Sequence, residues 1–387
     1  MKRYRYKHIL ALVLCAAFFS LPVVPVETEA VSVPVFYREK LPVPDFSLQT
    51  RVNAECAFLF APETNAVLLS QNADKKHGMA STTKIMTAIT ASELLPPDRE
   101  IVITEEMCGV EGSSIYLQPG EILTTEQLLY GLMLESGNDA AVALAIASCG
   151  SVERFAFLMN VKAALLGCRD THFTNPHGLS DKEHYTTARE LGLITAYALK
   201  NDSFRKIVST YTIRIPYKGT ENGRVLVNHN PILRSYEGIF GVKTGWTTDD
   251  GKCFVTAAMR DGLTLVAVSL GDTNISATHR RLLDLGFASF ETVVPEVQTA
   301  FLLPLVGGGK AFVNVRLSSL PAFCVPKGAV VSGRIEAPRF LYAGVREGET
   351  VGRVVFYAGE TVLGQAELVC GENTVHKRIS IWEKVFG

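Results

Sequence analysis

Strand-like patterns lie at both ends of residues 54–290, and helix-like patterns fill the middle of that stretch. Near its start, two short apolar runs within 54–70 flank a turn, which is typical of a β-hairpin. Near its end, the runs 253–259 and 263–270 are joined by a tight turn and predict a second hairpin. Helices inserted between such strands bury their apolar sides against the sheet. The order therefore predicts an α+β fold, with an antiparallel sheet covered by helices.

The pattern changes after about residue 294. Four strand-like runs follow, separated by glycine and proline, at 312–317, 329–335, 350–357 and 360–368. No cluster of reactive side chains accompanies them in the sequence. The chain is therefore expected to have one domain at 53–293 and a small all-β domain at 294–375, and its 47% of hydrophobic residues can supply their cores.

The first thirty residues have the composition of a secretory signal peptide. Four basic residues precede a long apolar run, and Thr28 and Ala30 fit a cleavage site made of small residues. A signal peptide at 1–30 predicts export to the outer face of the cytoplasmic membrane, the cell wall or the extracellular space. An uncleaved N-terminal membrane anchor is the alternative. The proline-rich residues 31–52 are expected to form an extended linker.

The end of the chain, residues 376–387, mixes apolar side chains with basic ones. Interfacial helices have such a composition, but this segment is short and its periodicity is mixed. The sequence leaves two possibilities open. The tail is amphipathic and makes a peripheral membrane contact, or it makes no such contact.

Charge and metal-ligand spacing argue against two other classes of function, nucleic-acid binding and metal binding. The formal net charge of −1 gives no indication of nucleic acid as a partner. The eight cysteines are scattered and form no Cys-x-x-Cys pair, which argues against zinc and against a disulfide framework. His172, His177 and His184 match no ligand motif. No metal and no cofactor is expected.

Ser81 and Lys84 stand three residues apart, where a polar stretch gives way to a helix-like run. Residues with this spacing lie on the same side of a helix, so their side chains can touch. A buried lysine loses its preference for the charged form, and a neutral amine beside a hydroxyl is a general base beside a nucleophile. The alternative is an ordinary helix start with a capping serine. Since Ser203 and Lys206 repeat the spacing, the pair alone does not decide.

Two further short motifs follow along the chain. Ser136 and Asn138 lie at a break between two apolar helical patterns, where such residues are usually caps. Lys243, Thr244 and Gly245 lie on a predicted strand, where they could form an exposed edge with a turn. Each motif has a structural explanation by itself. In this order, however, Ser-x-x-Lys, Ser-x-Asn and Lys-Thr-Gly form a catalytic signature.

With these motifs the chain resembles the penicillin-binding proteins and active-site serine β-lactamases, and among them the D-alanyl-D-alanine carboxypeptidases of low molecular mass. The likeness covers about residues 54–290. Further matching stretches are 173–179, 186–190, 228–230 and 282–287. The resemblance implies a β-lactamase/transpeptidase-like fold with an inserted helical region at 53–293, and it implies that the all-β part is the family's second domain.

The resemblance also implies an activity. A serine-type carboxypeptidase would remove the terminal D-alanine from peptidoglycan stem peptides through an acyl-enzyme, and β-lactam antibiotics would be its covalent inhibitors. Ser81 would be the nucleophile and Lys84 its neutral base. Ser136 would carry a proton to the leaving amine.

Substrate-binding roles follow from the same resemblance. Asn138 would hold the substrate's amide, and Lys243 and Thr244 would meet the terminal carboxylate. Gly245 would let the substrate backbone lie close to the strand. The backbone N–H of Trp246, together with that of the nucleophile, would bind the tetrahedral oxyanion.

One position departs from the family pattern. Relatives usually have an arginine shortly before the last helix, thought to help bind the carboxylate, and Ile275 falls there. Arg280 and Arg281 are nearby but out of register. Either another cation serves, or the preference for a free carboxylate is weaker.

Three alternative functions are considered. A D,D-endopeptidase uses the same motifs. A β-lactamase is disfavoured because residues 167–180 contain no Glu-x-x-Leu-Asn sequence. A non-catalytic cell-wall-binding protein is disfavoured by the intact motifs.

Overall fold

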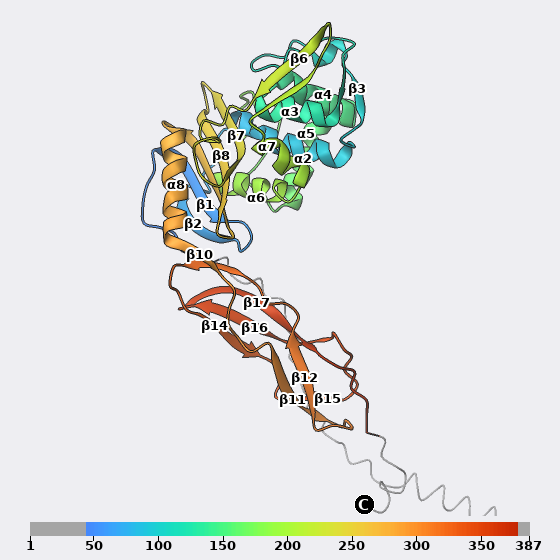
Figure 1. Ribbon diagram of the computed structural model, residues 1–387, viewed down its shortest axis with the longest axis vertical. Coiled ribbons are helices and arrows are strands. Elements are labelled where there is room, and N and C mark those ends of the chain that lie inside the picture. The colour runs from blue at the N-terminus through green and yellow to red at the C-terminus, as the bar shows by residue number, and fades with distance from the viewer. Residues whose placement is uncertain (1–43, 378–387) are drawn as a thin grey trace, which may run out of the picture. The chain divides into compact units, whose positions relative to one another are not determined.

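The structure, a computed structural model, describes residues 44–377 (Figure 1). The predicted signal peptide, residues 31–43 of the predicted linker and residues 378–387 of the predicted tail lie outside the described residues.

A five-stranded antiparallel sheet forms the centre of the first domain, in the strand order β2-β1-β9-β8-β7. The two predicted hairpins are present, and β1 pairs with β9, for example Phe58 with Val268. This pairing joins the early and late parts of the domain and confirms the α+β prediction. The strands are β1 (Ala54–Ala61), β2 (Ala66–Gln71), β7 (Ile239–Thr247), β8 (Gly251–Arg260) and β9 (Leu263–Asp272).

Helices cover both faces of this sheet (Figure 1). Because successive strand residues point to opposite faces, Phe58 of β1 belongs to one core and its neighbour Leu59 to another. Leu59 packs in the core that includes Leu283 of α8 (Ile275–Ser289). Phe58 packs in the larger core that α2 (Lys84–Leu94) and α6 (Ala188–Ala198) share.

The inserted helical region consists mainly of α3 (Thr125–Leu134), α4 (Asn138–Cys149) and α5 (Val152–Leu165). A capping box of Thr124 and Gln127 starts α3. Sequence patterning did not predict α7 (Asp202–Ser209), although its capping residue Asn201 is a recognisable start signal. No single helix within 44–377 is long and apolar enough to cross a bilayer. Only the bent pair α4 and α5, 85° apart, would pass on length and composition.

Short elements complete this domain. The strands β3 (Glu100–Val102) and β4 (Ile122–Thr124) pair with each other, as do β5 (Thr212–Tyr217) and β6 (Thr220–Val227). Two 3₁₀ turns are η1 (Ala80–Thr83) and η2 (Glu105–Met107).

The described part of the predicted linker is not a free segment. Phe46 N–H donates to the Val67 carbonyl at 2.8 Å, and Leu48 N–H donates to the Leu68 carbonyl at 2.7 Å. These bonds lay the chain along the outer edge of β2, which sequence composition did not indicate.

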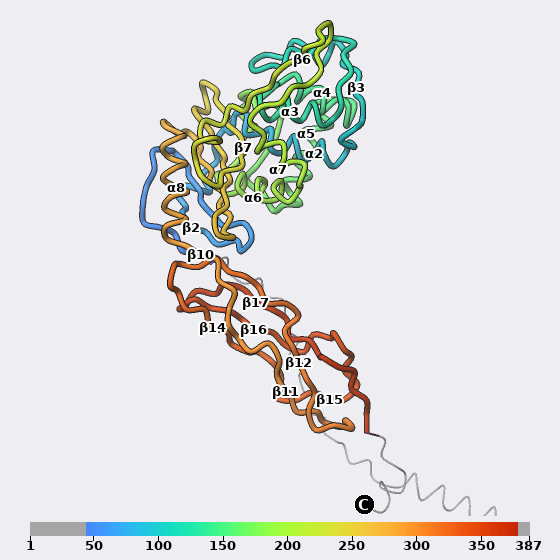
Figure 2. The backbone as a smooth tube through the Cα atoms, in the orientation of Figure 1, coloured from blue at the N-terminus to red at the C-terminus, as the bar shows by residue number. Residues whose placement is uncertain are grey.

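The C-terminal part is all-β, as predicted, and Figure 2 traces the chain into it after α8. Its main sheet has the order β14-β16-β17-β12-β11-β15, and β10 pairs separately with β13. Val315, Phe356 and Leu368 lie in its own core. The strands are β10 (Phe290–Val293), β11 (Ala300–Val306), β12 (Phe312–Leu317), β13 (Phe323–Pro326), β14 (Val331–Glu336), β15 (Leu341–Tyr342), β16 (Thr350–Ala358) and β17 (Thr361–Cys370).

Candidate active site

Ser81 lies on the 3₁₀ turn η1, and Lys84 is the first residue of α2. The sequence predicted an α-helix start here, whereas the structure has a tighter turn. Side chains three residues apart are eclipsed in a 3₁₀ turn, so the spacing still brings the two groups together. The Nζ of Lys84 lies 3.0 Å from the Oγ of Ser81.

Lys84 is fully buried, and its amine has three polar contacts. Its Nζ donates to the side-chain Oδ1 of Asn138 and to the backbone carbonyl of His177, both at 2.6 Å. Both oxygens can only accept, so they take the two protons of a neutral amine. The hydroxyl of Ser81 can accept from a protonated amine or donate to the lone pair of a neutral one, so the contact suits both forms.

Electrostatics favour the same neutral form. Burial holds the pKa of Lys84 well below its ordinary 10.5. The charge of Lys243 lowers this pKa further, and Asp139 opposes the shift. The contact with Ser81 and the lowered pKa of Lys84 are both features that a general base for Ser81 would need.

The connection between α3 and α4 carries the second motif. Ser136 has a φ of 61°, an uncommon left-handed conformation for a serine, and is buried. Asn138 begins α4, and its Nδ2 donates to the Glu111 carbonyl at 2.5 Å while its Oδ1 accepts from Lys84. The amide of Asn138 thus orients Lys84, a role that sequence reasoning missed because it depends on a long-range contact.

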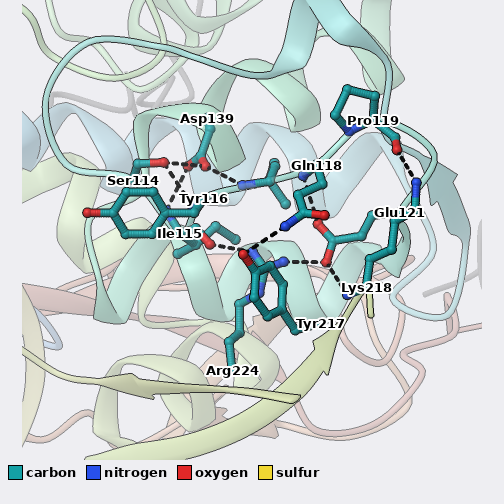
Figure 3. Close-up of polar contacts among 11 residues, drawn as sticks. Ser114, Ile115, Tyr116, Gln118, Pro119, Glu121, Asp139, Tyr217, Lys218 and Arg224 are labelled. Atoms are coloured by element: carbon teal, nitrogen blue, oxygen red, sulfur yellow. Dashed lines mark hydrogen bonds and ion pairs between the residues drawn. The ribbon is translucent and has the colours of Figure 1, made fainter. Parts of the chain in front are cut away.

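A loop between η2 and β4 supplies that Glu111 carbonyl, and Asp139 fastens the loop to α4. The carboxylate of Asp139 accepts from the Ser114 hydroxyl at 2.6 Å and from the backbone N–H groups of Ile115 and Leu117 at 3.1 and 3.0 Å. Figure 3 shows this cluster beside the loop. The residue after Asn138 therefore holds the segment that orients Asn138.

The hairpin of β5 and β6 holds the same loop from its other side (Figure 3). Arg224 and Glu121 form a buried ion pair, and Arg224 also donates to the Ile115 carbonyl. Tyr217 completes the contact, since its hydroxyl accepts from Gln118 at 2.8 Å and its ring lies under Arg224. None of these residues was singled out from the sequence.

Strand β7 brings the third motif to the Ser81 turn, and both figures of the whole chain place β7 beside the start of α2. A Cβ added at Gly245 would lie 2.7 Å from the backbone nitrogen of Ser81. Glycine therefore permits the close approach of β7 to the nucleophile turn. Trp246, the next residue, is 65% exposed.

Lys243 is buried on β7, and its Nζ donates to the Thr244 carbonyl at 2.8 Å. Burial lowers the pKa of Lys243 to about 7, and the charge of Glu135 opposes this shift. The three motifs thus meet in one place, as their Ser81–Lys84, Lys84–Asn138 and Gly245–Ser81 contacts require.

The arginines considered as replacements for the family's missing cation are engaged elsewhere. Arg280 donates to the backbone carbonyl and the hydroxyl of Ser235, and Arg281 donates to Thr50. Ile275 begins α8 and packs against the core on that face. Within residues 44–377, no group of three or more His, Cys, Asp or Glu side chains is arranged to hold a metal ion.

Known proteins resemble this chain in sequence and fold. The sequence profile of the family described as D-alanyl-D-alanine carboxypeptidase matches residues 44–274. D-alanyl-D-alanine carboxypeptidase DacF of Bacillus subtilis is 30% identical over 335 residues, or 83% of this chain and 85% of that protein. DacC of Escherichia coli, also a D-alanyl-D-alanine carboxypeptidase, is 31% identical over 344 residues, covering 83% and 84%. The structure of penicillin binding protein 5 from Haemophilus influenzae has a TM-score of 0.75 at 26% identity, covering 85% of this chain and 99% of that one.

Proposed function

The chain belongs to the D-alanyl-D-alanine carboxypeptidase family, and on this premise we propose how its own residues remove the terminal D-alanine of a peptidoglycan stem peptide. The family is serine-based and penicillin-binding, and it acts on peptides that end in D-Ala-D-Ala. The observation that carries the proposal is the contact of Lys84 with Ser81, in which both other polar partners of the amine are acceptors.

Acylation begins when neutral Lys84 takes the proton of the Ser81 hydroxyl. The Oγ then attacks the carbonyl carbon between the two D-alanines, and the carbonyl oxygen becomes an oxyanion. The backbone N–H groups of Ser81 and Trp246 stabilise this charge. When the C–N bond breaks, the leaving amine receives a proton through Ser136, and D-alanine departs.

Deacylation repeats the same proton movements with water as the nucleophile. Lys84 takes a proton from the water, whose oxygen attacks the acyl carbon, and the Ser81 oxygen leaves and recovers a proton. A β-lactam forms the corresponding acyl-enzyme when its amide bond opens on Ser81.

Substrate binding falls to the third motif. Lys243, while protonated, and the hydroxyl of Thr244 meet the terminal carboxylate. This division is supported by the charge of Lys243, which depresses the pKa of Lys84. With a pKa of about 7, Lys243 is part-charged at neutral pH, and its charge favours the neutral form of Lys84.

Release of free D-alanine from a peptide ending in D-Ala-D-Ala tests the proposal. Wild-type protein should release it, and Ser81→Ala should not. Ser203→Ala is the matched control, because Ser203 has the same spacing to Lys206 but is exposed, and Lys206 pairs with Glu126 at 2.9 Å. Equal release by wild type and Ser81→Ala would remove Ser81 as the nucleophile. A cross-linked dimer peptide in parallel separates carboxypeptidase from endopeptidase activity.

We further propose that the enzyme works outside the cytoplasm, as its relatives' substrate requires. The signal-peptide features at 1–30 support export. Membrane contact through residues 376–387 is a separate proposal, and within it only His376 and Lys377 are described, on the strand-like bridge to Gly308 and Gly307. Sedimentation of the mature protein with and without residues 378–387 on anionic vesicles tests it.

A further inference from the structure

A chain of hydrogen bonds runs behind the nucleophile turn and ends on the peptide that contains the Ser81 N–H. The backbone N–H of Thr174 donates to Nδ1 of His184 at 3.1 Å. Nε2 of His184 lies 2.8 Å from the hydroxyl of Thr83, and that hydroxyl donates to the carbonyl of Ala80 at 2.7 Å. His184 and Thr83 are both buried.

The donors and acceptors in this series of hydrogen bonds fix the direction in which each bond is donated. A ring nitrogen that accepts from a backbone N–H carries no proton, so the other nitrogen of a neutral imidazole carries it. His184 therefore donates from Nε2 to Thr83, and Thr83 is left with its own proton for Ala80. Burial supports the neutral ring, since it lowers the pKa of His184 to about 4.

Ala80 is held in an unusual conformation. Its φ is 46°, a left-handed value that costs energy for a residue other than glycine. Its N–H donates to the carboxylate of Asp250 at 3.0 Å, and its carbonyl accepts from Thr83. A Cβ at Gly178 would lie 2.0 Å from the Ala80 carbonyl oxygen, so glycine there leaves room for this orientation.

The direction of the Ala80 carbonyl decides the direction of the Ser81 N–H. Both belong to one planar trans peptide, in which C=O and N–H point in opposite directions. With the carbonyl fastened toward Thr83 and Gly178, the N–H points the other way. The Ser81 nitrogen faces Gly245 of β7, where Trp246 follows.

We propose that His184 is a positioning residue of the oxyanion hole, which acts through the Thr83 hydroxyl on the Ala80 carbonyl and so aims the Ser81 N–H. This inference rests on the proposed function. His184 and Thr83 are buried and are not themselves the oxyanion-hole donors, so their loss should change the direction of the Ser81 N–H and leave that donor in place. Removing an oxyanion-hole donor costs about 100- to 1000-fold in kcat, and a misaimed one should cost about tenfold.

Two truncating variants and two conservative ones test the proposal. Thr83→Val removes the hydroxyl and His184→Leu removes the Nε2 donor, and each new side chain is similar in size to the one it replaces. Thr83→Ser keeps the hydroxyl, and His184→Gln keeps an N–H donor near the position of Nε2. Thr195→Val is the matched control, since its buried hydroxyl also donates to a backbone carbonyl, that of Leu191 at 2.7 Å, away from the site.

The measurements distinguish a loss of transition-state binding from a general loss of stability or substrate binding. They are kcat and KM for D-alanine release, the affinity for a peptide boronic acid that forms a tetrahedral adduct on Ser81, and the thermal midpoint. Thr83→Val and His184→Leu should lower kcat and boronate affinity about tenfold, with KM within about twofold of wild type. Thr83→Ser and His184→Gln should restore most of both, and Thr195→Val should match wild type.

Two results would overturn the inference while the proposed function stands. One is an active wild type whose Thr83→Val and His184→Leu variants keep the wild-type kcat. The other is a loss in which KM rises as much as kcat falls and the boronate loses no more affinity than a substrate peptide. A wild type that releases no D-alanine and is not labelled by a fluorescent penicillin would instead overturn the proposed function itself.

Discussion

At the scale of single residues, two buried lysines interact electrostatically and are suited to different tasks. Lys84 donates to Asn138 and His177, and its third contact is the Ser81 hydroxyl. Lys243 donates only to the Thr244 carbonyl among the described residues. Because two positive charges disfavour each other where both side chains are buried, protonation of one lysine helps to keep the other neutral.

Lys84→Arg should abolish acylation by a fluorescent penicillin. A guanidinium stays protonated at any usable pH, so it cannot take the proton of Ser81. Labelling followed on a gel measures the effect, and Lys206→Arg, at the exposed pair with the same spacing, should label as wild type. Full labelling of Lys84→Arg would refute the general-base assignment.

Lys243→Gln should move the acid limb of the acylation rate to higher pH. Lys84 must be neutral to act, so acylation is lost as the pH falls through the pKa of Lys84. The charge of Lys243 lowers that pKa, and its removal therefore raises it, although burial still holds it below 10.5. The pH profile of penicillin acylation, normalised for each protein, measures the limb. A limb that stays in place or moves to lower pH would contradict the coupling.

At the scale of elements, the site depends on a loop that is fastened from two directions. Asp139 at the start of α4 binds it on one side, and Arg224 of β6 binds it on the other (Figure 3). The ion pair of Arg224 and Glu121 is buried. Removing one partner of such a pair is strongly destabilising, because the other charge stays buried without compensation. The β5–β6 hairpin thus supports Asn138 through a segment that neither strand contains.

Arg224→Met should lower the free energy of unfolding by about 3–5 kcal/mol, because it leaves the carboxylate of Glu121 buried without its partner. The double variant Arg224→Met with Glu121→Leu should recover part of this loss. Urea denaturation measures both. Lys218→Met is the control, since exposed Lys218 contacts the same loop and should cost less than about 1 kcal/mol. A double variant less stable than Arg224→Met would contradict the explanation.

At the scale of the whole molecule, the described residues form separate cores that meet at few elements. The all-β core around Phe356 is distinct from the two cores of the first domain. Two links join them: β13 pairs with β10 and contributes Cys324 to the core that contains Phe290, and Phe46 packs against both this core and the all-β core. The domain boundary near residue 294 stays a prediction that a truncation can test.

A chain ending at Val293 should still be labelled at Ser81 by penicillin, because all three motifs lie before that point. It should unfold at lower urea than the full chain, since the core that contains Phe290 loses Cys324 and β10 loses its partner strand. Labelling and urea midpoints of the two chains measure this. A truncated chain without folded structure would show that the two parts are one cooperative unit.

Much of the fold and of the site could be predicted from local patterns. The hairpins follow from alternation and turn residues within a few positions, and the all-β part follows from its strand spacing. The contact of Ser81 with Lys84 follows from a three-residue spacing that survives the change from an α-helix to a 3₁₀ turn. The features that could be predicted in this way depend on residues that are close together in the sequence.

The sequence by itself determined the features that depend on local spacing, which are the two hairpins, the strands of the all-β part and the three motifs. Tertiary structure alone decided that Asn138 orients Lys84, that Arg224 holds the loop through Glu121, and that residues 44–48 lie along β2. These contacts join residues far apart in the chain, so no periodicity encodes them. Their energies come from burial and partner geometry, which exist only after the chain has packed.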